Sequence, residues 1–155
     1  MKNQGTSNVT LAVVSSNIIE KNEKFLLVQE GHKHAYGLWD FRAGKLEEEI
    51  TLTENAVKEA KEETGYRVKV QRLVGVYQKI QNGRNVVIFV FASSIVGGKL
   101  RTDYPDDEIL GARWFTYEEL KKMKDKLRDG YILDFIKLYR KKQPANKIFY
   151  INQLR

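Results

Sequence analysis

The chain has no cysteine among its 155 residues. This absence excludes disulfide bonds, a thiolate nucleophile and a zinc site built from thiolates. It agrees with a reducing compartment, and we expect the cytoplasm. The first ten residues, MKNQGTSNVT, are polar and precede only the short apolar run LAVV, so they do not predict a secretory signal.

Long apolar runs are also absent. No stretch approaches the roughly 18 consecutive apolar residues that a membrane-spanning helix needs, so we expect no membrane partner. The sequence shows no low-complexity tract, internal repeat or interdomain linker. With 42% hydrophobic and 11% aromatic residues, the composition is typical of a globular protein, and the length predicts one domain over residues 1–155.

Positive charge is concentrated near the C-terminus. Residues 121–155 carry 11 Lys and Arg against 3 Asp and Glu, whereas residues 1–120 carry 16 against 17. A basic segment can contact nucleic acid or another polyanion. A solvated, lysine-rich helical face explains the charge more simply, so nucleic acid is an alternative partner that we do not favour.

Hydrophobic periodicity predicts mostly strands first and helices last. Strands are predicted over residues 9–19, 24–31, 37–44, 66–80, 84–96 and 111–115. QNGR, residues 81–84, predicts a hairpin turn. Helical patterns cover residues 52–64, 116–127 and 131–142, and residues 146–154 are expected to form a strand or a short helix. Because only one helix separates the strand runs, we predict an α+β fold with a mixed β-sheet.

Three carboxylates crowd one side of the helix predicted over residues 52–64. At 100° per residue, Glu59, Glu62 and Glu63 fall within an arc of about 100°. Glu59 and Glu63 form a like-charged i,i+4 pair, which disfavours an isolated helix. We expect Glu63 to point partly toward the face that packs on the sheet. That face is predicted to consist of Thr53, Val57, Ala60 and Thr64.

Converging carboxylates of this kind suit Mg²⁺ or Mn²⁺. The fragment alone is more typical of a solvated helix on which lysines pair with glutamates, but its surroundings favour a site. Residues 44–66, GKLEEEITLTENAVKEAKEETGY, resemble the Nudix box: glycine, five residues, glutamate, seven residues, then arginine, glutamate, aliphatic, any, glutamate, glutamate, any, glycine, aliphatic. The matching positions are Gly44, Glu59, Ala60, Glu62, Glu63 and Gly65, with Tyr66 as the final apolar residue.

The resemblance to the Nudix (MutT-like) hydrolase family implies an α/β/α sandwich over about residues 8–142, with residues 143–155 as a C-terminal extension. It implies attack by water on a diphosphate linkage of a nucleoside di- or triphosphate or a related small molecule. Mg²⁺ or Mn²⁺ would be held by Glu59, Glu62 and Glu63, aided by the backbone carbonyl of Gly44 or of the preceding alanine.

Further residues could complete such a site. One of the helical glutamates, or Glu108 from a later loop in competition with its two aspartate neighbours, would act as the base. Arg42 and Lys45 flank the glycine turn and could meet phosphate, while Tyr77 and Phe89 could stack on a base. Surface charge explains Arg42 and Lys45 equally well, and aromatic residues in strands, such as Tyr77 and Phe89, more often belong to the core. Core packing is also expected for Trp39 and Trp114, and exposure for His32 and His34.

Two positions depart from the box. Ile50 replaces its glutamate and Lys58 replaces its arginine, and a lysine cannot copy the planar fork with which an arginine orients neighbouring carboxylates. Together with the basic C-terminal segment, these departures keep open a Nudix-fold nucleotide or polyanion sensor with little or no turnover. The basic segment also keeps open an RNA-end pyrophosphohydrolase that uses it to hold RNA. The sequence leaves a monomer and a homodimer equally open.

Overall fold

The computed structural model describes residues 10–81, 83–142 and 148–150. Its strands are β1 (Thr10–Lys21), β2 (Lys24–Glu30), β3 (Trp39–Asp40), β4 (Arg42–Lys45), β5 (Tyr66–Gln81), β6 (Arg84–Gly98), β7 (Ile109–Thr116) and β8 (Ile148–Tyr150). Its helices are α1 (Leu52–Thr64), α2 (Tyr117–Lys122) and α3 (Tyr131–Lys141), with 3-10 turns at Lys33–Ala35 and Lys124–Lys126.

The predicted elements are present, with differences in length. The strand predicted over residues 37–44 is two short strands, β3 and β4, and the helix predicted over residues 116–127 is α2 followed by a 3-10 turn. β8 confirms the strand alternative for the last segment, whose remaining residues lie outside the described part. None of the helices in the described ranges is long and apolar enough to cross a membrane.

The described strands form one mixed sheet in the order β3-β2-β1-β6-β5-β8, with β4 paired to β1 and β7 paired to β2. β1 runs parallel to β6, and β5 runs parallel to β8. The remaining pairs are antiparallel, including the long β5–β6 hairpin. The predicted mixed sheet is therefore confirmed.

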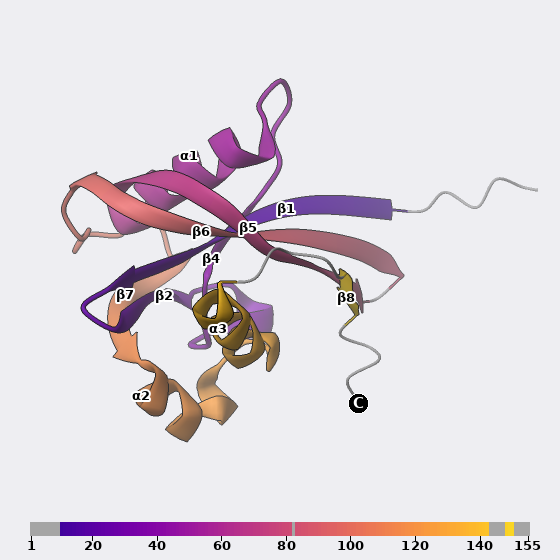
Figure 1. The fold of residues 1–155 in the computed structure, drawn as a ribbon. Helices are drawn as coiled ribbons and strands as arrows, with labels where there is room; N and C mark the ends of the chain where they lie inside the picture. Colours follow the sequence, from indigo (N-terminus) through magenta and orange to yellow (C-terminus); the bar gives the residue numbers. More distant parts are fainter. Residues whose placement is uncertain (1–9, 82, 143–147, 151–155) are drawn as a thin grey trace, which may run out of the picture.

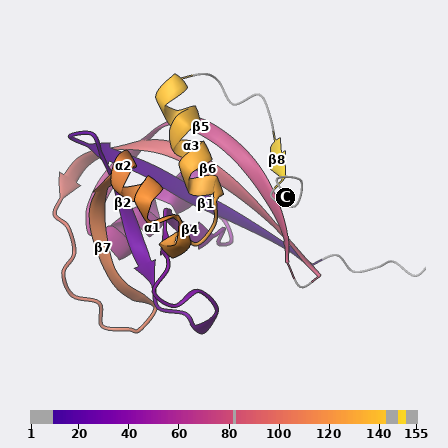
Figure 2. The same ribbon diagram turned by 90° about the horizontal axis from the view of Figure 1, so that it is seen from below.

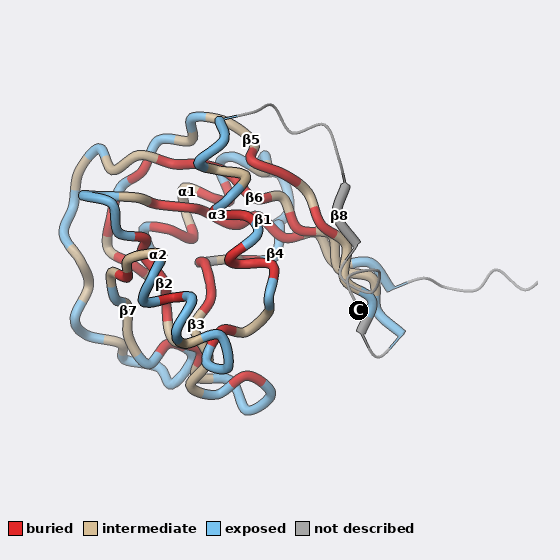
Figure 3. The backbone as a smooth tube through the Cα atoms, turned by 60° about the horizontal axis from the view of Figure 1, so that its bottom comes forward, coloured by how far each residue is buried: buried red, intermediate tan, exposed pale blue. Residues whose placement is uncertain are grey.

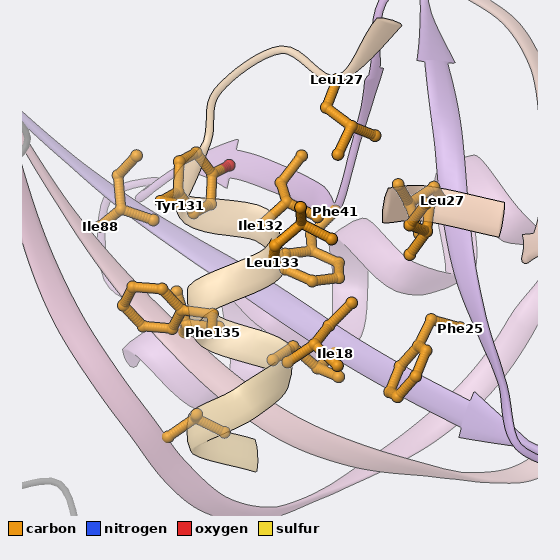
Figure 4. Packing of buried hydrophobic residues seen from close by; sticks show 14 of the residues in the cluster. Ile18, Phe25, Leu27, Phe41, Ile88, Leu127, Tyr131, Ile132, Leu133 and Phe135 are labelled. Atoms are coloured by element: carbon orange, nitrogen blue, oxygen red, sulfur yellow. The ribbon is translucent and has the colours of Figure 1, made fainter. Parts of the chain in front are cut away.

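Helices cover both faces of this sheet (Figures 1 and 2). α1 lies on one face, over a cluster that includes Ala60 of the helix and Ile19, Leu26 and Val68 of the strands. α2 and α3 lie on the other face. There α3 contributes buried residues to a larger core together with strand residues such as Ile18, Phe25 and Ile88 (Figure 4).

Burial follows this layering. The central strands are buried along much of their length, while the connecting loops are largely exposed (Figure 3). Two hydrophobic cores, one on each face of the sheet, are the arrangement that a three-layer protein requires. The predicted α/β/α sandwich is confirmed, and α1 packs on the part of the sheet formed by β1, β4 and β5.

Candidate functional site

α1 begins and ends where the sequence predicts. The Thr51 hydroxyl accepts a hydrogen bond from the Glu54 amide at 3.2 Å, and the Glu54 carboxylate accepts one from the Thr51 amide at 2.7 Å. This capping box lowers the pKa of Glu54, chiefly through the Thr51 amide. Gly65 ends the helix in the left-handed conformation, with φ at 80°, which glycine adopts without strain.

The face of α1 that packs on the sheet is rotated from the predicted one. Thr53 is exposed and Val57 is half-buried, so the prediction was wrong for Thr53, whose hydroxyl lies 3.2 Å from that of Thr51 at the exposed start of the helix. The buried residues of the helix are Asn55, Ala56, Glu59, Ala60 and Thr64. Three of them, Asn55, Glu59 and Thr64, are polar. A search for apolar side chains at helical spacing assigns Asn55 and Glu59 to solvent.

The Glu59 side chain packs against Gly44, the first residue of the box. Only 8% of the Glu59 surface is exposed. Its carboxyl group packs directly on the Cα atom of Gly44 in β4, because a methyl group at Gly44 would lie 2.0 Å from Glu59 Cδ and 2.2 Å from Oε1. Any side chain at residue 44 would therefore displace this carboxylate.

The other two glutamates lie progressively further out. Glu63 is half-buried, in agreement with its predicted inward direction, and Glu62 is exposed. The Glu62 carboxylate lies 3.8 Å from Lys58 Nζ. Among the described residues, no three Asp, Glu or His side chains are gathered closely enough to hold a metal ion. The structure thus places the three carboxylates on one side of α1 without assembling them.

These residues nevertheless fit a divalent cation in kind and position. Glu59 is a buried carboxylate held against a glycine, and Glu62 and Glu63 follow it within one helical turn. All the side-chain donors are hard oxygen atoms, which Mg²⁺ and Mn²⁺ prefer. Movement of the exposed Glu62 side chain costs little, because a surface ion pair such as Lys58–Glu62 contributes only marginally to stability.

Lys58, at the box arginine position, has a partner that the sequence did not reveal. Its ammonium group donates a hydrogen bond to the Glu47 carboxylate in the loop between β4 and α1. This bond is the main reason why the pKa of Lys58 is raised. Ile50 is half-buried in the same loop. The loop therefore supplies a carboxylate to residue 58 from position 47 rather than from position 50.

The candidate phosphate-binding residues Arg42 and Lys45 lie in β4, whereas the candidate base Glu108 lies in the loop directly before β7. Lys45 is exposed directly after Gly44, at the end of β4. Arg42 pairs with Asn17 in the sheet, and its side chain lies outside the described part of the chain. Glu108 is exposed. It does not belong to a group of three or more Asp, Glu or His side chains that could hold a metal ion, since the described residues contain no such group. Its carbonyl accepts a hydrogen bond from the Gly31 amide at 2.9 Å, which fixes its loop beside the end of β2.

The two candidate aromatic residues face opposite sides of the sheet. Tyr77 is only 1% exposed and packs in the α3-side core, with its ring 4.2 Å from that of Tyr131 between centroids. Phe89 is half-buried and pairs with Ser15, which contacts α1 through Asn55. Tyr77 is therefore a core residue rather than one that can stack on the same base as Phe89.

The tryptophans and histidines lie where the sequence predicts. Trp39 and Trp114 are half-buried against the two cores, and His32 and His34 are exposed.

Sequence reasoning missed a buried polar cluster on the α3 side. The Tyr131 hydroxyl donates a hydrogen bond to Asp40. Arg128 Nη1 lies 2.9 Å from Glu30 Oε2 and 3.8 Å from Asp40 Oδ2, and the Arg128 amide donates to the Trp39 carbonyl at 2.9 Å. The cluster ties the start of α3 to β3, the strand that leads into β4. No spacing rule connects these distant positions.

Burial dominates the electrostatics of this cluster. It raises the pKa of the Asp40 carboxyl to about 6, because desolvation outweighs the hydrogen bond from Tyr131 and the charge of Arg128. Burial also raises the pKa of Tyr131 and of Tyr77 well above the usual value. The folded protein therefore holds a proton on Asp40 more tightly than the unfolded chain does.

We expect Asp40→Asn to flatten the pH dependence of stability. The carboxyl pKa is 3.8 ordinarily and about 6 in the folded protein, so the stability contributed by this group falls as the pH rises from about 4 to 6 and is constant above that window. The loss amounts to about 3 kcal/mol. Urea denaturation between pH 4.5 and 7.5 should show the free energy of unfolding falling more steeply in the wild type than in Asp40→Asn.

The control for this prediction is Asp125→Asn, which changes an exposed aspartate and should follow the wild-type curve. The comparison isolates Asp40, since the wild type and Asp40→Asn share all other titrating groups and Asp125→Asn shows the effect of removing an exposed carboxyl group. Parallel curves for Asp40→Asn and the wild type would show that the Asp40 carboxyl does not titrate in this window.

Comparisons with known proteins identify the family to which the chain belongs. The family model described as NUDIX domain matches residues 10–135. The chain is 34% identical over 104 residues to 8-oxo-dGDP phosphatase NUDT18 of Danio rerio, covering 66% of this chain and 31% of that protein. It is 33% identical over 114 residues to ADP-ribose pyrophosphatase of Methanocaldococcus jannaschii, covering 72% and 66%. The chain thus spans less than two thirds of the length of these curated relatives.

The fold is shared with solved structures as well. A NUDIX hydrolase from Nitrosomonas europaea superimposes with a TM-score of 0.76 at 25% identity, over 88% of this chain and 93% of that one. The residues that the family model matches include both β4, which carries Gly44, and α1, which carries the three glutamates. The chain belongs to the NUDIX family.

Proposed function

We propose that this chain is a divalent-metal-dependent hydrolase that cleaves a diphosphate linkage in a nucleoside di- or triphosphate or a related nucleoside diphosphate derivative. The observation that carries the proposal is the contact between the Glu59 carboxyl group and Gly44, on the side of α1 that also bears Glu62 and Glu63. Membership of the family supports the reaction. The two named relatives support the substrate class, because 8-oxo-dGDP and ADP-ribose both contain a nucleoside diphosphate.

Glu59, Glu62 and Glu63 would hold Mg²⁺ or Mn²⁺, together with the backbone carbonyl of Gly44 or Ala43. When bound, the cation neutralises phosphate charge and lowers the pKa of a coordinated water molecule. The protein contributes preorganisation: Glu59 is buried and held by contact with a glycine, so one carboxylate is in place before substrate arrives.

The remaining roles belong to residues around the glycine loop. Lys45 and Arg42 would neutralise substrate phosphates, and Phe89, on the α1 side of the sheet, would contact the base. A carboxylate would accept the proton of the attacking water, either from the helix or from Glu108. General base catalysis of this kind contributes roughly 10²- to 10⁴-fold to a rate.

A hydrolysis screen tests this proposal. The purified chain is incubated with Mg²⁺ and, in parallel, with a chelator, over nucleoside di- and triphosphates, nucleotide sugars, dinucleoside polyphosphates and thiamine diphosphate. We expect metal-dependent cleavage of at least one compound with a nucleoside diphosphate. Tight nucleotide binding without cleavage would instead support the sensor alternative, which Ile50 and Lys58 motivate. Affinity for RNA that falls steeply with salt would support the RNA-end alternative.

We predict that the C-terminal residues are dispensable for chemistry. β8 pairs with the outer edge of β5, with Ile148 opposite Val76, and it lies outside the box. Removing residues 145–155 should leave turnover on a small nucleotide within a few-fold and lower Tm by roughly 2–8 °C, because it uncovers that strand edge. A truncated protein that remains folded but loses turnover would show that the extension takes part in the site.

A further inference from the structure

A buried asparagine links α1 to the glycine of the box. Asn55 and Ser15 are both fully buried. Asn55 Nδ2 donates one hydrogen bond to Ser15 Oγ at 2.7 Å and a second to the Gly44 carbonyl at 3.1 Å. A carbonyl oxygen can only accept, so this bond identifies the amide nitrogen as the atom that faces Gly44.

Asn55 and Glu59 contact the same glycine from successive turns of α1. The amide of Asn55 holds the Gly44 carbonyl, while the carboxyl group of Glu59 packs on the Gly44 Cα atom. Residues four apart lie on one side of a helix, so a single side of α1 makes both contacts. A shift of the Gly44 backbone would therefore move the surface on which the Glu59 carboxylate rests.

Packing alone does not explain an asparagine at this position. Asn55 Oδ1 is buried and accepts no hydrogen bond from the described residues, which is unfavourable for a buried acceptor. Asparagine is also a poorer helix former than alanine. The neighbouring buried positions Ala56 and Ala60 show that small apolar residues fit this side of the helix. The hydrogen bonds of the Asn55 side chain are therefore the two that its Nδ2 atom donates, to Ser15 and to Gly44.

We propose that Asn55 is a positioning residue for the cation and diphosphate site, fixing the Gly44 carbonyl and, through Gly44, the place of the Glu59 carboxylate. The inference rests on the proposed function, because it takes these groups as the ones that bind the cation. Residues that orient metal ligands without binding the metal typically change affinity or activity 10- to 100-fold when replaced.

Asn17 provides a matched control within the same chain. It is 1% exposed, its Nδ2 donates to the Ala56 carbonyl of α1 at 2.8 Å, and its Oδ1 accepts from Ser93 Oγ at 2.8 Å. Asn17 therefore anchors α1 to β1 through a buried amide, as Asn55 does through Ser15. Its hydrogen bonds go to residues other than Gly44. Replacing Asn17 removes a hydrogen bond that holds α1 but leaves the bond from Asn55 to the Gly44 carbonyl in place.

The experiment compares Asn55→Leu with Asn17→Leu, since leucine keeps the branched shape of asparagine and removes the donor. Mn²⁺ affinity is measured without substrate by electron paramagnetic resonance, together with thermal melts. The Mg²⁺ concentration for half-maximal turnover is measured in parallel. Asn55→Leu should weaken Mn²⁺ binding 10- to 100-fold and raise the Mg²⁺ requirement to a similar extent, with turnover at saturating Mg²⁺ largely restored. Asn17→Leu should leave both metal values within about 3-fold.

Several results would overturn the inference. Wild-type Mn²⁺ affinity in Asn55→Leu, or equal weakening in both variants, would show that Asn55 only holds the helix. Asn55→Ala, which cannot overfill the site, replaces Asn55→Leu if the latter does not fold. A wild-type protein that binds no Mn²⁺ would overturn the proposed metal site itself, and that outcome is distinguishable because it does not depend on either variant.

Discussion

Replacing Glu59 or Glu63 by glutamine is expected to lower turnover by roughly 10²- to 10⁴-fold while the protein stays folded. The carboxamide keeps the size of the side chain but removes the charge that a divalent cation requires. The helix itself should not suffer, because Glu59 and Glu63 repel each other as an i,i+4 pair and neutralising one of them is worth a few tenths of a kcal/mol. Glu62→Gln should behave similarly.

Rates are measured on the best substrate of the screen, with far-UV circular dichroism and thermal melts to establish folding. Glu118→Gln is the matched control, because Glu118 is an exposed helical glutamate that pairs with Lys121 at 2.9 Å on α2, across the sheet from α1. It should retain wild-type turnover. Full activity in both Glu62→Gln and Glu63→Gln would exclude this side of α1 as the metal site.

Gly44→Ala should produce a loss of comparable size by a different route. The new methyl group would lie 2.0 Å from Glu59 Cδ, so the carboxyl group must leave its position. The fold should tolerate the change, because the clashing atoms belong to the end of a flexible side chain rather than to backbone. We expect turnover to fall by at least about 10²-fold, as displacement of a catalytic group by about an ångström can do, with Tm changed by only a few degrees.

Gly111→Ala is the control for this substitution. Gly111 also lies in a strand, β7, and a methyl group there would have no neighbour within 4 Å. The two variants therefore add the same atom, one against Glu59 and the other into open space. If Gly44→Ala and Gly111→Ala had the same turnover, the contact between Gly44 and Glu59 would have no part in catalysis.

The elements that the sequence predicted well are those with local signals. The span of α1 follows from a threonine cap, a glutamate three residues later and a terminal glycine, all of which act within the helix. The β5–β6 hairpin follows from its turn. The hairpin pairs Gln81 with Arg84, and hence Tyr77 with Ile88. Counting that register would have placed Tyr77 and Phe89 on opposite faces, so the signal for this correction was available.

The features that were missed depend on partners far away in the sequence. Asn55 is buried because Ser15 and the Gly44 carbonyl accept its hydrogen bonds, and Asp40 is buried because Tyr131 and Arg128 surround it. A single sequence shows neither set of partners. Reasoning from polarity therefore places such residues in solvent, and only the tertiary structure corrects it.

The support of the box glutamates was predicted in part. The sequence identified Ile50 and Lys58 as departures from the box, but it could not show which carboxylate meets Lys58. The structure identifies Glu47. Since this pair is exposed at both ends, it restrains Lys58 only weakly, so a lysine held by one hydrogen bond remains a looser support than an arginine with two parallel ones.

The central claim, water attack on a diphosphate linkage that requires a divalent metal ion, is tested most directly by turnover in ¹⁸O-labelled water. The best substrate of the screen is hydrolysed in H₂¹⁸O with Mg²⁺ and, separately, with a chelator, and the products are analysed by mass spectrometry. We predict that one ¹⁸O atom enters a phosphate-bearing product in the presence of Mg²⁺ and that no product forms with the chelator. Equal turnover in the chelator, or label found only in a product without phosphate, would contradict the account.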